Sequence, residues 1–590
     1  QLICFNTLKA TVFNRRQLKI EQLLVFGILL LAILYKPWND SWQRIISGDG
    51  LGYYSYLPHM FVYRGEGAFS WFNDVYPHYY SQEMFQHPRD HFMVQTQEGG
   101  FNKYAPGLAL LWLPFFLIAH GIALALHLPA DGFSQCYQIA VGCASIIFMV
   151  LCVCFSLKLF SAFKLHNVWI RLFALLLLVF GTGLFEQSLW YSGLSHVYSA
   201  ALFTGMLLFL ENYKSSLNIK HVGWAFFCFI LLVSIRPLLL LTLVLWLPYR
   251  TLKPLHGITF KQLVLPCSLI ILIISWTLGW NVYQYGQIWK YTYVNESFAW
   301  FEPHLFHLFW NYSLGLVWQR PWIIVAILAL LLFFKTYRFW ALGYILLTYV
   351  YACWWYWPIL DRALIDLSII PVLAITQIAH KVSANAWRTL MFTCSVMAVC
   401  TGWHVLKSYQ RHVGIIDSYA SDADDFFSNA FRIRPASIFS VPKNSIIKQQ
   451  LLPFSSGNSA GIVLKPKNGF YESDKIAVPD FFKSTDIKKI KIQFTASSAV
   501  PPKNLHLWIR LYAKGNQLLK EFPFYLNSTQ LQSSPEKYAF GCSEINSQGL
   551  FYTAEKISCA FWLPEDKGWV EIQDLKGEAF TTNTVYETIR

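Results

Sequence analysis

The chain has 590 residues, of which 55% are hydrophobic, 18% aromatic and only 14% charged. In soluble domains, charged residues make up about a quarter of the sequence, so this composition excludes an ordinary soluble fold. The formal net charge is +14, but the Lys and Arg residues lie mostly in short segments between apolar runs and form no single basic face. The charge therefore indicates membrane topology, and we expect no nucleic acid among the partners.

The first apolar run follows a basic N-terminal segment. Lys9, Arg15, Arg16 and Lys19 precede it, and the positive-inside rule then places the N-terminus in the cytoplasm. No signal-peptide cleavage pattern follows the run, so we expect a retained helix over 18–36.

Apolar runs close to the roughly 20 residues that span a bilayer recur along the chain. Basic clusters separate them, for example Lys158 with Lys164 and Arg171, and each cluster should lie on the cytoplasmic side. About eleven crossings satisfy this rule and leave the C-terminus outside. The crossings are expected near 18–36, 137–157, 168–185, 195–212, 221–236, 237–250, 263–283, 320–335, 339–354, 363–380 and 389–406.

The apolar stretch 106–127 is also long enough to cross, but one more crossing there would put every later basic cluster on the outer side. We therefore interpret it as an interfacial or re-entrant helix. Two short passes through the membrane would give the same parity.

Two segments remain on the outer face. The first outer loop, 37–105, is rich in aromatic, His and acidic residues, which is more than a connector needs. After residue 406, apolar and polar residues alternate in stretches such as Lys489 to Phe494, Leu505 to Leu511 and Ile557 to Trp562, broken by Pro, Gly, Asn and Ser. These stretches predict strands of a β-sandwich.

The sequence thus predicts a mostly α polytopic membrane protein with a C-terminal β-sandwich domain, jelly-roll-like, on the outer side. The expected divisions are a transmembrane domain over 1–406, a connector over 407–455 and the sandwich over 456–590.

The first outer loop contains a Gly-rich acidic motif directly after the first helix. Residues 47–58 read SGDGLGYYSYLP, with Asp49 between two glycines. Glycines let backbone and substrate approach an acid closely, while Tyr53 and Tyr54 supply amphipathic walls for a substrate site at the membrane surface. A Gly-rich turn with an aromatic belt explains the motif equally well.

Further polar motifs fall on the same face. NKYAPG at 102–107 opens the interfacial helix, and SH at 195–196 begins a crossing. RP at 236–237 divides two short crossings, although an Arg at a helix end also snorkels to the interface. GLVWQRP at 315–321 and WPILDR at 357–362 each precede a later crossing. Chance would scatter these motifs over both faces.

In this order, the motifs resemble the GT-C superfamily of polyprenyl-phosphate-sugar-dependent glycosyltransferases, which includes protein mannosyltransferases and the aminoarabinose transferases of lipid A. The resemblance covers residues 18–406. It depends on an acid after the first helix, a Lys-Tyr-x-Pro-Gly segment before an interfacial helix, a His-initiated crossing, and late Arg-Pro and Asp-Arg segments. Each motif is short, so only the ordered set on one face is specific.

The resemblance implies a donor whose lipid tail lies in the bilayer and whose phosphate and sugar sit at the outer surface. Asp49 would act as general base on an acceptor hydroxyl, with lipid phosphate as leaving group and inversion at the anomeric carbon. Protein mannosyltransferases place two acids in tandem here, whereas Gly50 follows Asp49 in this chain. The alternative acids are Glu186, Asp74 and Glu83.

A departing phosphate needs positive charge, and the planar guanidinium of Arg suits it. Arg320 and Arg362 are the candidate phosphate ligands, with Lys103 behind them. Asp366 lies four residues after Arg362, so an ion pair on one helix face is an equal alternative for that Arg. His196 would line the substrate site.

A divalent metal in the first outer loop is a further hypothesis, because imidazole and carboxylate groups suit zinc or manganese. Their spacing matches no closed ligand pattern, which favours ordinary polar loop residues. The residues concerned are His59, His78, His87, His91, Glu83 and Asp90. In the C-terminal domain, Cys542 and Cys559 would form a disulfide in an oxidising compartment or remain two buried thiols.

The sequence therefore predicts an inverting glycosyltransferase in a bacterial inner membrane, with its C-terminal domain in the periplasm. Its partners would be the bilayer, a polyprenyl-phosphate sugar as donor, and a glycan, lipid or protein acceptor. The principal alternative is a transporter or flippase of lipid-linked sugars without chemistry. Transporters place ionisable residues near the bilayer midplane and show repeats, whereas here the polar groups concentrate at one surface and no repeat is visible.

Overall fold

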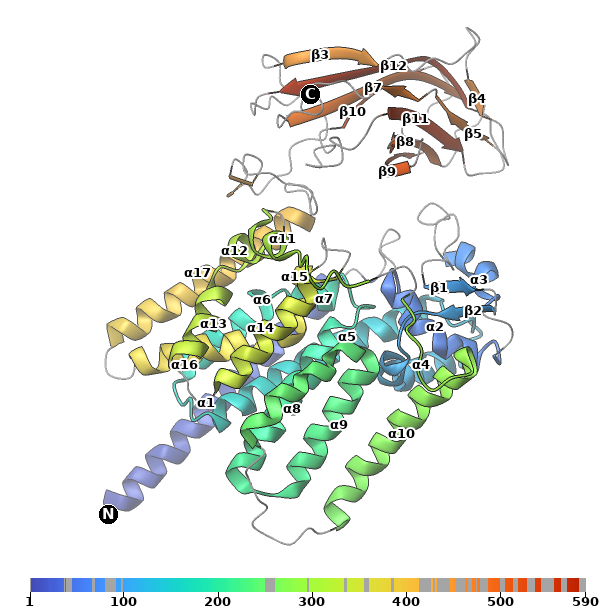
Figure 1. The fold of residues 1–590 in the computed structure, drawn as a ribbon. Coiled ribbons are helices and arrows are strands. Elements are labelled where there is room, and N and C mark those ends of the chain that lie inside the picture. Colours follow the sequence, from blue (N-terminus) through green and yellow to red (C-terminus); the bar gives the residue numbers. More distant parts are fainter. Residues whose placement is uncertain are drawn as a thin grey trace. The chain divides into compact units, whose positions relative to one another are not determined.

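The computed structural model of the chain divides into two compact units, whose elements are labelled in Figure 1. Unit 1 comprises residues 1–310 and 314–408, and unit 2 comprises 311–313 and 409–590. Unit 1 is mostly helical, and the regular elements of unit 2 are mainly strands. The structure describes residues 2–36, 38, 45–65, 69–79, 92–96, 99–249, 260–293, 297–312, 314–333, 337–354, 360–383, 387–412, 426–427, 430–431, 446–452, 462–464, 469–473, 475–477, 487–498, 504–512, 518–527, 536–542, 556–563 and 570–582.

Unit 1 contains helices long and apolar enough to cross a membrane. Among the described residues there are five of them, namely Gly107–Ala125 (α4), Gln135–Ala162 (α5), Lys261–Tyr285 within α10 (Phe260–Tyr285), Leu364–Val382 across η5 (Leu364–Leu367) and α16 (Ile369–Ser383), and Trp387–Arg411 within α17 (Trp387–His412). Shorter apolar helices are Val168–Phe180 (α6), Ile219–Ile235 (α9), the 3₁₀ helix Pro237–Tyr249 (η2), and Trp322–Leu332 within α13 (Trp322–Phe333). These helices indicate an integral membrane protein. The number of eleven crossings and the side on which each loop lies stay predictions.

The remaining helices of unit 1 are less apolar or shorter. They are α1 (Leu2–Tyr35), α2 (Asp49–Phe61), α3 (Phe72–Tyr79), α7 (Leu184–Leu189), α8 (His196–Ser216), α11 (Leu305–Trp310), α12 (Leu316–Gln319), α14 (Arg338–Ala352) and α15 (Leu360–Ala363).

Local chemistry explains where several helices begin and end. The Asn167 side chain accepts hydrogen bonds from the backbone N–H groups of Trp169 and Ile170, and Asn218 accepts one from Lys220, so both residues cap a helix start. α9 ends before Pro237, because Pro lacks the N–H that would continue the hydrogen-bond ladder.

The core of unit 1 surrounds α8, which is buried along almost its whole length and packs against α5 and α9. Figure 1 shows α8, α9 and α10 side by side. Large apolar side chains on α4, α10 and α17 point outward instead, among them Ile118, Ile271 and Val399. Exposed apolar faces of this kind are what lipid-facing helices require.

The described part of residues 37–105, the segment predicted to form the first outer loop, contains regular elements. It contains α2, α3 and an antiparallel pair of short strands, β1 (Met93–Thr96) and β2 (Gly99–Asn102). The stretch predicted as an interfacial helix forms α4, which is among the five helices of membrane-spanning length. Its interfacial placement therefore stays a prediction.

Unit 2 contains two antiparallel sheets of five strands each. One has the order β10–β7–β12–β3, with β4 also on β12, and the other has the order β5–β11–β8–β9, with β6 also on β11. The strands are β3 (Ile446–Leu452), β4 (Ile462–Leu464), β5 (Gly469–Glu472), β6 (Ile476–Ala477), β7 (Ile487–Ser498), β8 (Asn504–Tyr512), β9 (Leu518–Asn527), β10 (Glu536–Cys542), β11 (Lys556–Leu563) and β12 (Val570–Thr582).

The three stretches that predicted strands lie in β7, β8 and β11. β3 lies within 407–455, which the sequence suggested as a connector, and it pairs with β12 as an integral strand. Face-to-face packing of the two sheets as a sandwich stays a prediction. Cys559 on β11 is a buried free thiol, and Cys542 lies on β10 of the other sheet.

Candidate functional site

Asp49, the predicted catalytic base, is the first residue of α2. The Tyr104 hydroxyl donates a hydrogen bond to Asp49 Oδ1 at 2.8 Å. Arg362 Nη2 lies 3.7 Å from Asp49 Oδ2. The side chain of Asp49 is 34% exposed and that of Arg362 is 25% exposed, so solvent or a substrate can reach both. The structure thus brings together two residues that are more than 300 positions apart in the sequence.

The glycines beside Asp49 allow this part of α2 to be approached closely. A Cβ atom on Gly52 would lie 2.1 Å from the Tyr104 ring, and one on Gly50 would lie 2.8 Å from the Gly193 carbonyl oxygen. Side chains at either position would therefore collide with their neighbours. This close packing is the physical reason for glycine at positions 50 and 52, whereas Gly48 has a φ of 53°, in the left-handed region that favours glycine.

The segment that carries Tyr104 is fixed against α2 by hydrogen bonds. Asn102 Nδ2 donates to the Gly52 carbonyl at 2.7 Å and to Ser55 Oγ at 3.1 Å. Asn102 Oδ1 accepts from the backbone N–H of Tyr104 at 3.0 Å. The Asn-Lys-Tyr motif therefore holds the Tyr104 hydroxyl on Asp49.

A second acid lies beside this pair in a buried ion network. Asp366 Oδ2 lies 2.8 Å from Arg236 Nη1, and Asp366 Oδ1 lies 2.9 Å from His196 Nδ1. The Tyr351 hydroxyl donates to Asp366 Oδ2 at 3.5 Å. The Asp366 side chain is 0% exposed. Among the described ion pairs, Asp366 joins Arg236 and His196 and not Arg362, so the pair four residues apart is not the one that forms.

Tyr53 connects the two groups. Its ring centroid lies 4.8 Å from that of Tyr104. Burial raises the pKa of Tyr53 to about 12, with the charges of Asp49 and Asp366 adding to the increase and that of Arg236 opposing it. Burial and the charge of Asp49 likewise hold the pKa of Tyr104 well above its usual range. Both hydroxyls therefore keep their protons and remain hydrogen-bond donors at neutral pH.

Lys103, predicted behind the phosphate ligands, lies at the edge of this group. Its ammonium is 5.5 Å from the centroid of the Tyr104 ring and 5.8 Å from that of Tyr293, which are cation–π distances. The cluster formed by Asp49, Tyr53, Lys103, Tyr104, His196, Arg236, Arg362 and Asp366 is called the Asp49 cluster below.

Arg320 belongs to a neighbouring buried group. The residue is 2% exposed. A Cβ atom built on Gly183 would lie 2.9 Å from Arg320 Nη2 and 3.5 Å from His404 Nε2, so both side chains face Gly183. Glu186, one of the alternative acids, lies on α7 and accepts a hydrogen bond from Ser408 Oγ. The side chain of Ile365, which precedes Asp366 in η5, lies 3.3 Å from the same Cβ position on Gly183. The helix η5 therefore links the Arg320 group to the Asp49 cluster. A phosphate-binding role for Arg320 stays a prediction.

Tyr54 and Asp74 are not part of the Asp49 cluster. Tyr54 is fully buried and its hydroxyl donates to the Gly132 carbonyl at 2.6 Å. Asp74 is exposed on α3. Glu83 lies outside the residues that the structure describes.

The described residues contain no group of three or more His, Cys, Asp or Glu side chains able to hold a metal. His87, His91, Glu83 and Asp90 of the metal hypothesis, and the side chain of His78, lie outside the described part of the chain. His59 is described, and its Nδ1 accepts from Trp71 Nε1 at 3.0 Å inside an aromatic cluster. A divalent metal stays a hypothesis.

The sequence interpretation missed the partnership of Asp366 with Arg236 and His196. The sequence indicates either a functional role or snorkelling for Arg236, and it offers Asp366 only as a partner of Arg362. An acid and an arginine in or beside apolar runs were signals that each needs a partner, because an unpaired charge is costly there. Their distance along the chain hid which partner it is.

The site as a whole presents cationic side chains around a partly exposed carboxylate, an arrangement suited to an anion. Three cationic side chains lie around two acids, one of which is buried and fully engaged while the other is partly exposed. Asp49 is therefore the carboxylate of this cluster that an incoming hydroxyl can reach.

Comparisons with known proteins give little further guidance. No protein-family model matches the chain, and no curated protein matches it. A solved structure that does match is the cryo-EM structure of the arabinosyltransferase EmbB from Mycobacterium smegmatis, with 10% sequence identity and a TM-score of 0.31. The match covers 74% of this chain and 57% of that one. A likeness this slight does not establish a shared activity.

Proposed function

We propose that the chain is an inverting glycosyltransferase that moves a sugar from a polyprenyl-phosphate donor to an acceptor hydroxyl at the outer face of the membrane. The observation that carries this proposal is the partly exposed Asp49 carboxylate, held by the Tyr104 hydroxyl and faced by the Arg362 guanidinium. The ordered motifs that resemble the GT-C superfamily support it, since their Asp, Lys-Tyr, His and Asp-Arg segments supply much of this cluster.

In the proposed reaction, Asp49 accepts the proton of the acceptor hydroxyl while the acceptor oxygen attacks the anomeric carbon. The bond between that carbon and the phosphate oxygen breaks, and polyprenyl phosphate leaves with the bonding electron pair. Attack opposite to the leaving group inverts the anomeric centre. The proton on Asp49 is then released to solvent.

Arg362 is the proposed ligand of the leaving phosphate, with Lys103 as a second cation. The guanidinium is charged at any physiological pH and offers a planar fork to two phosphate oxygens. At 3.7 Å from Asp49 and 25% exposed, it can turn to a phosphate without leaving a buried acid unpaired. Tyr104 would keep the Asp49 carboxylate oriented toward the acceptor.

The proposed partners follow from this chemistry. The donor's lipid chain would lie in the bilayer, and a glycan, lipid or protein would supply the acceptor hydroxyl. The β-strand unit would be periplasmic and hold the acceptor or cover the site. A divalent metal remains an additional hypothesis for the first outer loop.

Asp49→Asn tests the proposal most directly. Asn keeps the size of the side chain and cannot take the proton, and general base catalysis contributes roughly 100-fold to 10,000-fold. The rate of transfer from a radiolabelled polyprenyl-phosphate sugar to cell-envelope acceptors should therefore fall by this factor, because the activation barrier rises by about 3 to 5 kcal/mol. Donor binding should persist. Asp74→Asn in the same loop is the matched control and should keep its activity.

Two results would decide against this assignment. Full transfer by Asp49→Asn would move the base to Glu186, Asp74 or Glu83. If none of these acids matters, but purified protein in vesicles moves the lipid-linked sugar between leaflets, the transporter alternative holds.

A further inference from the structure

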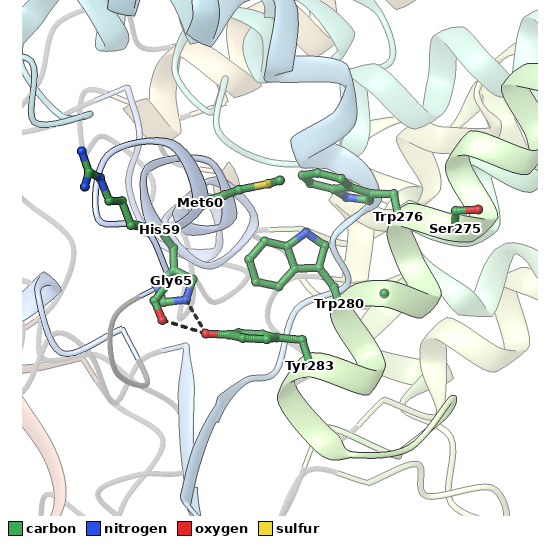
Figure 2. A pocket seen from close by; sticks show the side chains of 9 residues that line it. His59, Met60, Gly65, Ser275, Trp276, Trp280 and Tyr283 are labelled. Atoms are coloured by element: carbon green, nitrogen blue, oxygen red, sulfur yellow. Dashed lines mark hydrogen bonds between the residues drawn. The ribbon is translucent and has the colours of Figure 1, made fainter.

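A cavity lined by described residues lies away from the Asp49 cluster, where the C-terminal end of α2 meets α10. Its volume is about 350 Å³, within the roughly 300–1,000 Å³ usual for ligand pockets. Asp49 and Met60 are at opposite ends of α2, about 16 Å apart along the axis at 1.5 Å per residue. Figure 2 shows Met60 pointing toward Trp276, with Trp280 and Tyr283 along the same face of α10.

The walls of this groove are mainly apolar, and the polar groups of Trp276 and Tyr283 bond to the protein itself. Trp276 Nε1 donates to the Pro106 carbonyl at 2.9 Å. The Tyr283 hydroxyl donates to the Gly65 carbonyl at 2.8 Å and lies 3.3 Å from His59 Nε2. Burial lowers the pKa of His59 to about 4, so its ring is neutral. The groove therefore presents ring faces and a thioether to its occupant.

The groove is open to the surroundings of the bundle and carries one charge. Apolar side chains on the outward face of α10, including Leu272, Leu278 and Val282, are exposed beside it. Arg64, in the turn after α2, is its only charged lining residue. An apolar chain with an anionic head matches this pattern, whereas a sugar would need the polar contacts that the walls already use internally.

We infer that this groove binds one anionic phospholipid of the surrounding bilayer, with an acyl chain against Trp276, Trp280 and Met60 and the phosphate at Arg64. The inference concerns a site separate from the proposed reaction. A phosphate at Arg64 lies beyond the far end of α2 from Asp49, so it cannot be the phosphate that leaves the anomeric carbon there. The lipid would instead fasten the first outer loop to α10.

Gly279 provides a sharp test because it lines the groove and has nothing within 4 Å of the place where a Cβ atom would be. Gly279→Leu therefore adds an apolar side chain to the groove at a position with room for its Cβ atom. Gly121 on α4 is also an exposed helical glycine with nothing within 4 Å, so Gly121→Leu is the matched control. Arg64→Gln removes only the charge, in a turn outside the helices, and serves as an independent variant.

The full-length protein in detergent micelles would be titrated with phosphatidylglycerol or phosphatidylcholine of the same chains, with bound lipid counted by native mass spectrometry. We expect one tightly held phosphatidylglycerol on the wild type and on Gly121→Leu, and none at the same concentration on Gly279→Leu. Arg64→Gln should reduce the preference for phosphatidylglycerol over phosphatidylcholine about tenfold, the value of one charge-assisted contact.

Unchanged phosphatidylglycerol binding in both Gly279→Leu and Arg64→Gln would overturn the inference. Displacement of the lipid by equimolar polyprenyl phosphate would also overturn it, because the groove would then hold the donor. Asp49→Asn should bind the lipid as the wild type does. A loss of sugar transfer and a loss of lipid binding are therefore separable results.

Discussion

Two ion pairs of the Asp49 cluster differ in burial, and this difference assigns them different roles. Asp366 is 0% exposed and Arg236 is 21% exposed, whereas Asp49 and Arg362 are 34% and 25% exposed. Removing one partner of a buried pair leaves an uncompensated charge and costs roughly 3–5 kcal/mol, while exposed pairs contribute about 0–1 kcal/mol. The Asp366 network is therefore structural support for the site, and the Asp49 pair is available for chemistry.

Asp366→Asn should destabilise the protein by about 3 kcal/mol, toward the lower end for a buried pair because Arg236 keeps some contact with solvent. Arg362→Ala should change stability by about 1 kcal/mol or less and should weaken donor binding. Thermal unfolding in detergent measures the first effect, and the KM for the donor measures the second. Equal destabilisation by the two substitutions would show that Arg362 is structural as well.

At this scale the sequence could single out Asp49 as a candidate acid, but it could not show which side chains surround it. Asp49 was identifiable because glycines flank it directly after an apolar run. The sequence offered Asp366, four residues away, as the ion-pair partner of Arg362, whereas the structure places Arg362 next to Asp49. Long-range side-chain pairing depends on how helices pack, and a single sequence does not encode that packing in any short pattern.

At the scale of elements, Gly52 connects the α2 helix to the segment that carries Tyr104. Gly52→Ala should push the Tyr104 ring away from Asp49, since even a Cβ atom would lie 2.1 Å from that ring. Overpacking of this kind costs about 1–3 kcal/mol. We expect lower thermal stability and a transfer rate at least tenfold lower, which corresponds to an increase of about 1.4 kcal/mol in the activation barrier.

Gly402→Ala in α17 is the control for Gly52→Ala, because nothing lies within 4 Å of the position of a Cβ atom on Gly402. It should be neutral or stabilise the helix by up to about 1 kcal/mol, the difference in helix propensity between Gly and Ala. Wild-type stability and transfer in Gly52→Ala would mean that the close contact does not position Tyr104.

Helix positions were predictable where hydrophobicity and capping agree. The expected crossing at 221–236 overlaps α9, which begins after the Asn218 cap and ends before Pro237. The expected crossing at 168–185 ends earlier, since α6 stops at Phe180 and the chain turns through Gly183 with φ of 86° before α7. Apolar composition continued past this break, so the run alone could not show it.

At the scale of the whole molecule, the Asp49 cluster depends on the ends of several helices meeting on one side. Asp49 begins α2, His196 begins α8, Arg236 follows α9 and Arg362 lies in α15. In Figure 1, α2, α7 and α15 lie at the same end of the helical unit. The parity argument predicted a shared face for these motifs, and their contacts support it.

The sidedness of that face is the last prediction. The basic residues before the first apolar run predict an N-terminus in the cytoplasm, and the expected parity predicts that residue 590 lies outside. In intact cells, an impermeant thiol reagent should therefore label a cysteine tag after Arg590 and spare one before Lys19, in a background whose native cysteines are replaced. Both tags should react once the membrane is permeabilised, which controls for buried tags.

Labelling of both ends, or of neither, in intact cells would put the termini on one side. The crossings would then be even in number, and the Asp49 cluster would have to be assigned to a face by tags in the loops beside it.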